Sequence, residues 1–372
     1  MNSTIQFTRY LYNKQYCKTA LALSMLNKNI DQSLFWAYEL YFSGFTNETY
    51  ECLVTIYYDF YYILNASFEK YLLDMIQHHH QNFSTIYFII VNLMKRHYST
   101  DIFMLKGLTF SYDYDYETKN HCEQIYHHFI QHEFIELTII LLSHDNEFSN
   151  KELIMMYTKI LGYYISQGLN INSTIKIKEF QHLLTPTSII LSYKRILFLS
   201  RIIHLKSLFD NKKQGKAVYI RTLPTEDELY PFYTHIVDEE LSSDKILSFV
   251  TKYGMNDIEF ISLFHSLDIE IVSNAYLYHW EYYSYDTPLW KERFEYFGGI
   301  KDDETKTIIF ENHEKKDQFY YLFGYQPEEQ SQTIQNKSIV KKNQFQCSTI
   351  DFFEKFSKEN TIPLIPSLLE NL

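Results

Sequence analysis

The segment from Asp31 to Gly44, DQSLFWAYELYFSG, constrains the fold most, because it carries the start, the body and the stop of one helix. Asp31 is placed to cap the first turn, and Gly44 stands where helices commonly end in a left-handed residue. The body is apolar nearly all round, and only Gln32, Glu39 and Ser43 form a narrow polar stripe. Such a helix needs neighbours on several sides, so we expect it in the core of an N-terminal helical domain.

Helical patterns flank this segment and fill most of the chain. Lys14–Leu26 and residues 47–64 are the expected neighbours of the central helix, and a long helix is expected over residues 121–142. The one strand pattern is Thr305–Phe310, which we expect to pair with residues near Val218–Arg221. The sequence therefore predicts a mainly α fold, an irregular multi-helix bundle or helical-pair array. Its smaller α-rich C-terminal domain carries at most a short β-hairpin.

The length of 372 residues suits two domains. The best linker is Asn211–Lys216, NKKQGK, because it is polar and contains a glycine. This predicts a helical domain over residues 1–210, an α-rich domain over 216–362 and a loosely attached tail over 363–372.

Composition excludes several classes of protein. A formal net charge of −12 argues against a chain that coats nucleic acid along its whole length. The aromatic content of 18% is high, but Phe and Tyr have A/T-rich codons, so it is not by itself a sign of a ligand cage. The four cysteines are scattered without CxxC spacing, which is typical of free thiols in a reducing compartment. The N-terminus has no signal-peptide pattern and the apolar runs are too short to span a bilayer, so we expect a soluble intracellular protein.

The segment HCEQIYHHFIQHE contains the most tempting metal-binding pattern. On one continuous helix, His128 and His132 have the i, i+4 spacing of paired zinc-ligating histidines. The pattern is incomplete, because His121 would lie about 10 Å further along the axis and Phe129 replaces the glutamate of HExxH. A solvated polar face is the favoured interpretation, and metal-dependent catalysis is the weaker one. Neither a cofactor nor a catalytic residue is predicted, since the common nucleotide-binding and acyl-transfer motifs are also missing.

Two further clusters have a structural and a functional interpretation. Lys194, Arg195, Arg201 and Lys206 form the most cationic helical pattern, interleaved with aromatic residues, and could bind the phosphates of nucleic acid. A solvated helix face is favoured over that role. The segment HWEYYSYDTPLW could form an interface hot spot through Trp280, Tyr283 and Trp290. Core packing of these rings is the favoured alternative.

Five motifs together resemble a known family. They are SLFWAYELYFSG, IYYDFYYILNASFEKYL, DIFMLKG, WEYYSYDTPLWKERFEYFGG and QFYYLFGYQPEEQ. The chain resembles a family of uncharacterised proteins of nucleocytoplasmic large DNA viruses, the mimivirus-like giant viruses. The resemblance implies a viral protein made in infected cells, and it assigns no catalytic residue.

These observations favour a non-enzymatic helical interaction or scaffold protein with viral or host protein partners. We expect it in the virus factory of the host cytoplasm or in a virion assembly. The first alternative is a nucleic-acid-associated replication or transcription accessory factor, and the second is a metal-dependent enzyme.

Overall fold

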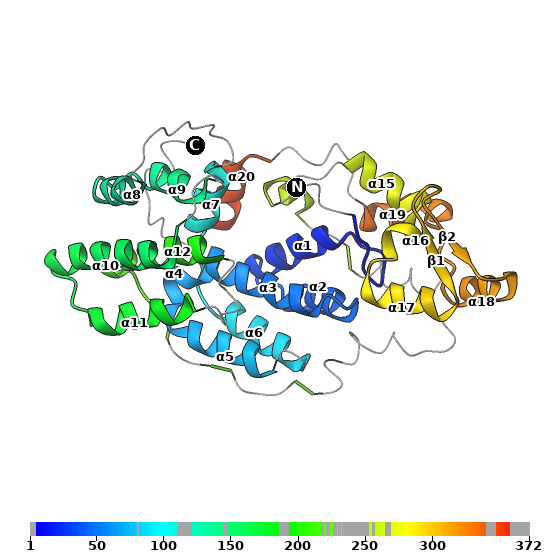
Figure 1. Cartoon of the computed structure of the whole chain (residues 1–372), viewed down its shortest axis with the longest axis horizontal. Helices are drawn as coiled ribbons and strands as arrows, with labels where there is room; N and C mark the ends of the chain where they lie inside the picture. Colours follow the sequence, from blue (N-terminus) through cyan, green and yellow to red (C-terminus); the bar gives the residue numbers. More distant parts are fainter. Residues whose placement is uncertain are drawn as a thin grey trace. The chain divides into compact units, whose positions relative to one another are not determined.

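The computed structural model describes residues 5–79, 82–109, 121–143, 148–185, 193–216, 219–220, 224–225, 229, 232, 253–254, 257–264, 269–339 and 347–357. In these residues the fold is mainly α-helical and contains one two-stranded antiparallel sheet (Figure 1). This confirms the predicted fold class. None of the helices in this part of the chain is both long enough and apolar enough to cross a membrane.

The chain divides into two compact units, each built from three separate stretches of sequence. Unit 1 contains Met1–Leu53, Asp74–Met94 and Tyr219–Ser348, whereas unit 2 contains Val54–Leu73, Lys95–Val218 and Thr349–Leu372. The sequence pattern instead predicts one linear boundary at residues 211–216, and the predicted tail, 363–372, lies outside the described residues.

The central helix of the N-terminal region is α2 (Ile30–Phe42), in unit 1. Its cap is Asn29, whose side chain accepts a hydrogen bond from the Gln32 N–H. The predicted cap Asp31 is therefore wrong, since this residue lies inside the first turn. The predicted stop is confirmed, because Gly44 adopts a left-handed φ of 93°.

Helix α2 packs most extensively against α1 (Lys14–Leu26) and α6 (Ser84–Met94). Helix α1 is the neighbour that the sequence predicts. The second main neighbour is α6, and not the predicted helix over residues 47–64. The helix that begins at residue 46 still touches α2, through the edge-to-face contact of Tyr41 with Tyr50. The centre of α2 is consequently buried, with Trp36 only 1% exposed.

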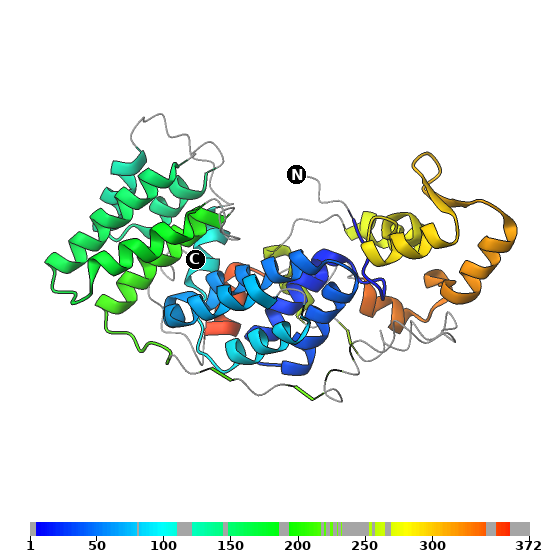
Figure 2. The ribbon, with the colours of Figure 1, turned by 60° about the horizontal axis from the view of Figure 1, so that its bottom comes forward.

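The C-terminal part of unit 1 contains a short hairpin. Its helical elements are η5 (Ile258–Leu263), α15 (Ile269–Tyr278), α16 (Trp280–Ser284), α17 (Pro288–Tyr296), α18 (His313–Phe323), η6 (Pro327–Glu329) and α19 (Gln332–Ser338). The expected strand is present as β2 (Thr307–Phe310), but its partner is β1 (Gly299–Asp302). The predicted pairing with residues 218–221 is wrong, because β1 lies next to β2 in sequence and a tight turn joins them. Figure 2 shows this ribbon beside the helices that pack on it.

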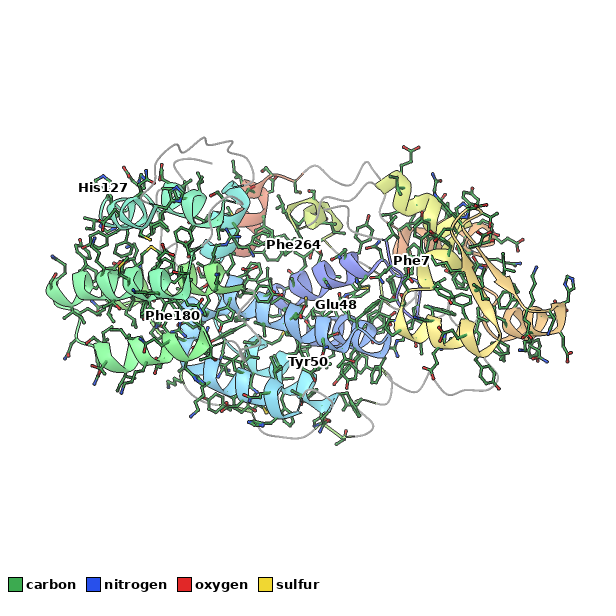
Figure 3. The ribbon with its side chains drawn as sticks, viewed as in Figure 1. Phe7, Glu48, Tyr50, His127, Phe180 and Phe264 are labelled. Carbon is green, nitrogen blue, oxygen red and sulfur yellow. The ribbon has the colours of Figure 1, made fainter. Side chains whose placement is uncertain are left out.

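Unit 2 contains most of the remaining helices. They are the π-helix η1 (Tyr57–Tyr61), α4 (Tyr62–Asn65), η2 (Ala66–Phe68), α7 (Asp101–Thr109), α8 (His121–Ile130), α9 (Phe134–Leu142), α10 (Asn150–Ser166), α11 (Ser173–Leu183), α12 (Lys194–Phe209) and α20 (Thr349–Ser357). The division between the units falls inside α3 (Thr46–Ile56) and α5 (Glu69–His79). Helix α12 packs against α4, α9 and α10, and most of its residues are buried. Phe180 of α11 joins this core through its contact with Phe198 of α12 (Figure 3).

The single helix predicted over residues 121–142 is wrong, because the chain breaks into α8 and α9. His132 has a left-handed φ of 61°, and its N–H donates to the Phe129 carbonyl. The Glu133 N–H donates back to the His128 carbonyl. This pair of bonds is a Schellman ending, which stops a helix by turning one residue left-handed.

Candidate functional site

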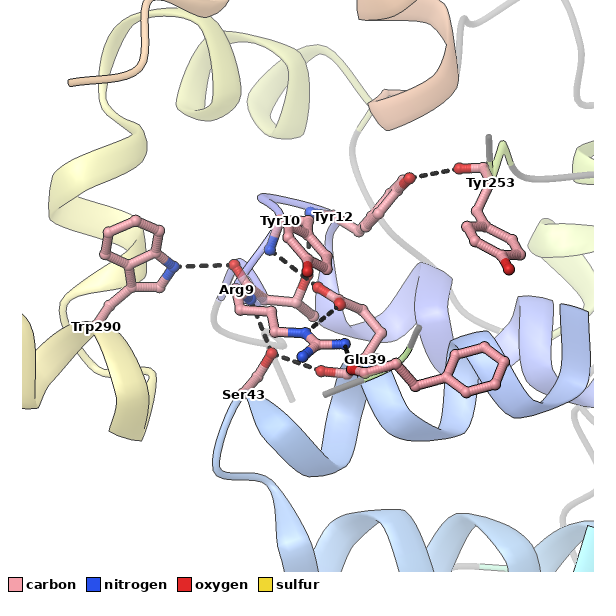
Figure 4. A network of polar contacts seen from close by, with 9 residues as sticks. Arg9, Tyr10, Tyr12, Glu39, Ser43, Tyr253 and Trp290 are labelled. Atoms are coloured by element: carbon pink, nitrogen blue, oxygen red, sulfur yellow. Dashed lines mark hydrogen bonds and ion pairs between the residues drawn. The ribbon is translucent and has the colours of Figure 1, made fainter. Parts of the chain in front are cut away.

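A buried ion pair joins the N-terminal segment of unit 1 to α2. The Arg9 Nε lies 2.8 Å from Glu39 Oε2, and the two residues are 3% and 0% exposed. The second carboxylate oxygen, Oε1, accepts the backbone N–H of Tyr10 at 2.9 Å. Figure 4 shows Arg9 and Glu39 at the centre of a larger set of polar contacts. Because a desolvated charge is costly, each member of this pair depends on the other.

Further hydrogen bonds complete the network. The Arg9 Nη2 donates to the Phe232 carbonyl at 2.8 Å, and the Arg9 backbone N–H donates to Ser43 Oγ at the same distance. Ser43 Oγ in turn donates to the Glu39 carbonyl at 2.6 Å. Glu39 and Ser43 both belong to the polar stripe expected on α2. Both are 0% exposed, and they bond to the buried N-terminal segment instead of facing water.

Contacts from the C-terminal part of unit 1 fix the same N-terminal segment. The Trp290 Nε1 donates to the Thr8 carbonyl at 3.0 Å, and Thr287 Oγ1 donates to the Phe7 carbonyl at 2.6 Å. The Tyr12 hydroxyl donates to the Tyr253 carbonyl (Figure 4). The N-terminal segment is therefore hydrogen-bonded to residues that lie more than two hundred positions away in the sequence.

Burial controls the titration of the groups beside the ion pair. Desolvation raises the pKa of Tyr12 well above its usual value, and the negative charge of Glu39 adds to the effect. Desolvation likewise raises the pKa of the Cys17 thiol. A protonated buried thiol is a poor nucleophile, so Cys17 acts as a core side chain at neutral pH.

Arg293 of α17 lies close to this network and differs from Arg9 in its partners. Its guanidinium carbon lies 4.7 Å from the ring centroid of Trp290 and 4.5 Å from that of Phe323. Among the described residues its guanidinium makes neither a hydrogen bond nor an ion pair. Burial, and then the positive charge of Arg9, lower the pKa of Arg293 to about 10. Arg293 therefore remains charged at neutral pH without an ion-pair partner in this part of the chain.

The basic residues predicted to bind phosphate do not share one open surface. Arg201 is 2% exposed, and its Nη2 pairs with Glu69 Oε2 at 2.6 Å. Tyr58 donates to the other oxygen of the same carboxylate at 2.8 Å. This pairing places Arg201 inside unit 2, out of reach of a surface ligand. The sequence does not reveal it, because Glu69 lies 132 residues earlier in the chain.

The other three cations are engaged closer to the surface. The Lys194 Nζ donates to the Phe148 carbonyl at 2.6 Å, and Arg195 Nη1 donates to the Ser143 carbonyl at 2.8 Å. Lys206 pairs with Asp210 one turn away at 2.6 Å. Phosphate binding by Lys194, Arg195 and Lys206 stays a prediction, and it would have to compete with these contacts.

The two histidines predicted as metal ligands are separated by the end of α8. His128 Nδ1 lies 2.7 Å from Glu133 Oε2, whereas His132 is the left-handed residue beyond the helix. The i, i+4 geometry on one helix is therefore wrong. Within the described ranges no group of three or more His, Cys, Asp or Glu side chains could hold a metal ion. His127 on the same helix is exposed (Figure 3).

The tryptophans predicted at an interface lie in the core of unit 1. Trp280 and Trp290 are 2% and 0% exposed, and their ring centroids are 5.3 Å apart. The Trp280 Nε1 donates to the Tyr325 carbonyl at 2.9 Å. Both indoles therefore serve core packing. Tyr283 is half-buried, and its role at an interface stays a prediction.

Unit 1 also exposes an apolar feature that was not predicted from the sequence. Ile300 and Ile309 are directly paired across the hairpin and are 68% and 58% exposed. Tyr296 and Tyr321, on the flanking helices, are 79% and 82% exposed. In the sequence, the only sign of this feature is the alternation of side chains along a short strand. That alternation does not reveal which face of the hairpin the helices cover.

No family model, curated protein or solved structure matches the chain. The network around Arg9 and Glu39 has the geometry of a structural centre, while the Ile300–Ile309 pair is exposed and the Arg293 guanidinium has no hydrogen-bond partner among the described residues.

Proposed function

We propose that the chain is a non-enzymatic helical interaction protein of a large DNA virus, acting in the virus factory or in a virion assembly. The observation that carries the proposal is the exposed Ile300–Ile309 pair on the hairpin. The viral setting rests on the resemblance of the five sequence motifs alone.

The two faces of the hairpin have different roles. Lys301 and Phe310 belong to the face that packs inward. Lys301 Nζ lies 2.5 Å from Asp286 Oδ2, and the Phe310 ring lies 5.2 Å from that of Phe319. Because side chains alternate along a strand, Ile300 and Ile309 point to the opposite face. That face is the side available to a partner.

Ile300 and Ile309 share this face with Asp302 and Thr307, but an exposed isoleucine pair is still unusual on a short ribbon. Most exposed ribbons carry polar or charged residues there, since paired aliphatic side chains invite association. Within the described residues neither β1 nor β2 pairs with a third strand. A protein partner could cover the two isoleucines and also hydrogen-bond to a strand edge.

The proposal is tested by affinity capture with the full chain from infected cells, followed by quantitative mass spectrometry. The test variant is Ile309→Asp, which places a charge on the outer face. The matched control is Ile175→Asp on α11, where the isoleucine is 51% exposed in unit 2. We expect Ile309→Asp to reduce the recovered partner by about tenfold or more, while Ile175→Asp leaves it unchanged.

Two outcomes would contradict the proposal. One is recovery of the same partners at the same level by Ile309→Asp and the native chain. The other is the absence of any specific partner in the native capture. Thermal unfolding of both variants serves as the control for folding, since both substitutions replace exposed side chains.

A further inference from the structure

The charges near the N-terminal segment of unit 1 do not balance. Arg9 and Arg293 each carry a positive charge, and Glu39 supplies the negative charge that pairs with Arg9. Glu292 is the acid nearest to Arg293 in sequence, but it forms no ion pair with it among the described residues. The guanidinium of Arg293 is therefore left without an ion-pair partner in the described part of unit 1, although the charge of Glu292 acts on it from further away.

The geometry holds Arg293 in place without using its hydrogen-bond donors. Trp290 and Phe323 contact its guanidinium at 4.7 and 4.5 Å, and such aromatic contacts leave the N–H edge available. The Trp290 indole is itself fixed, because it donates to the carbonyl of Thr8. Arg293 as a residue is half-buried.

Arg9 adds a second unfilled donor in the same part of unit 1. Its Nε and Nη2 have partners, but its Nη1 is buried with no hydrogen-bond partner in the described residues. Thr8, which accepts the Trp290 N–H, is the residue that precedes Arg9. A buried donor without a partner is costly and is commonly satisfied by a ligand or a water molecule.

We propose that Arg293, supported by the charge of Arg9, binds a small oxyanion, either a phosphate group or a carboxylate. A guanidinium presents paired N–H groups that match both anions, and a charge-assisted pair is strongest where water is partly excluded. This site is separate from the Ile300–Ile309 face, and its existence does not depend on the proposed function.

The test uses the full chain with arginine-selective ¹⁵N labelling. Inorganic phosphate and acetate are titrated in turn at constant ionic strength, and the Nε–H resonance of Arg293 is followed. Isothermal calorimetry gives the affinity of each probe. We expect a saturable shift at Arg293. Tighter binding of phosphate assigns a phosphoryl ligand, and tighter binding of acetate assigns a carboxylate ligand.

Variants on α17 separate the site from general charge. Arg293→Gln should weaken binding by about tenfold or more, whereas Lys291→Gln, which removes an exposed cation two residues away, should leave it unchanged. Arg293→Lys keeps the positive charge but lacks the paired N–H donors of the guanidinium, so it should bind with intermediate affinity. The proposal is overturned if neither probe gives a saturable shift, if sodium chloride reproduces the shift, or if Arg293→Gln binds as tightly as the native chain.

Discussion

Replacing Glu39 by glutamine removes the negative charge of the buried network while keeping the shape of the side chain. The carboxylate accepts Arg9 Nε on one oxygen and the Tyr10 N–H on the other. The amide of the variant would offer one carbonyl oxygen and one NH₂ group, so one of these donors would face another donor. Arg9, which is 3% exposed, would also keep a charge without its anion.

The expected cost follows from the burial of both partners. Breaking a buried ion pair by removing one member costs about 3–5 kcal/mol, because the remaining charge stays desolvated. A matched control is Glu48→Gln, since the Glu48 carboxylate pairs with Lys18 at 2.8 Å but its side chain is 35% exposed. Solvent screens that pair, and we expect a loss of about 1 kcal/mol or less. Figure 3 shows Glu48 on the neighbouring helix.

The assay is urea unfolding of the full chain, followed by circular dichroism and by hydrogen exchange in peptides from α1 and α2. The variants are Glu39→Gln, Arg9→Gln and the double variant. Because the two residues form one pair, the double variant should cost less than the sum of the single ones by at least about 1 kcal/mol. A loss below about 1 kcal/mol for Glu39→Gln, or strictly additive losses, would refute the reasoning.

Three other predictions concern individual positions. Trp36→Ala should lower the free energy of unfolding by about 3–5 kcal/mol, because the indole is 1% exposed, and a stable variant with lost partner binding would contradict this. Gly44→Ala should cost more than Gly168→Ala in thermal unfolding. Both glycines are left-handed, but only a Cβ at Gly44 would meet Pro288, at 2.5 Å; equal costs would exclude the steric effect. Burial lowers the pKa of His204 from 6.5 to about 4, so the fold favours the neutral ring. The contribution of the neutral His204 to the free energy of unfolding is full above pH 6.5 and is lost as the pH falls towards 4, by about 2 kcal/mol at pH 5. The free energy of unfolding in urea should therefore depend less on pH in His204→Gln than in the native chain.

Local signals predict the elements better than they predict the contacts between them. The α2 helix and its Gly44 stop follow from residues within one turn of each other, so they can be read along the chain. The predicted cap is two positions away from the observed one because Asn29 and Asp31 are both suitable capping residues. His132 is the left-handed residue that separates α8 from α9. The sequence pattern runs a helix through it, because histidine is not a residue that typically ends helices.

The candidate site is beyond the reach of such signals. Glu39 belongs to a stripe that periodicity can identify, but periodicity does not say whether the stripe meets water or an arginine. Arg201 illustrates the same difficulty, because its cationic helix pattern suggests a surface role until Glu69 is known to be its partner. The contact of Arg293 with Trp290 lies within one helix turn, but its contact with Phe323 comes from another helix and cannot be read from the local pattern.

The sequence by itself determined that the chain is mainly helical, where several helices begin and end, and that a strand lies near residue 307. Those features depend on interactions between residues that are close along the chain. Only the tertiary structure decided which polar residues are buried and which apolar residues are exposed. Arg9 meets Glu39 across 30 residues, and Trp290 meets Thr8 across 282. The free energy of a charge or an isoleucine depends on the groups packed around it, and the fold brings those groups from distant parts of the sequence.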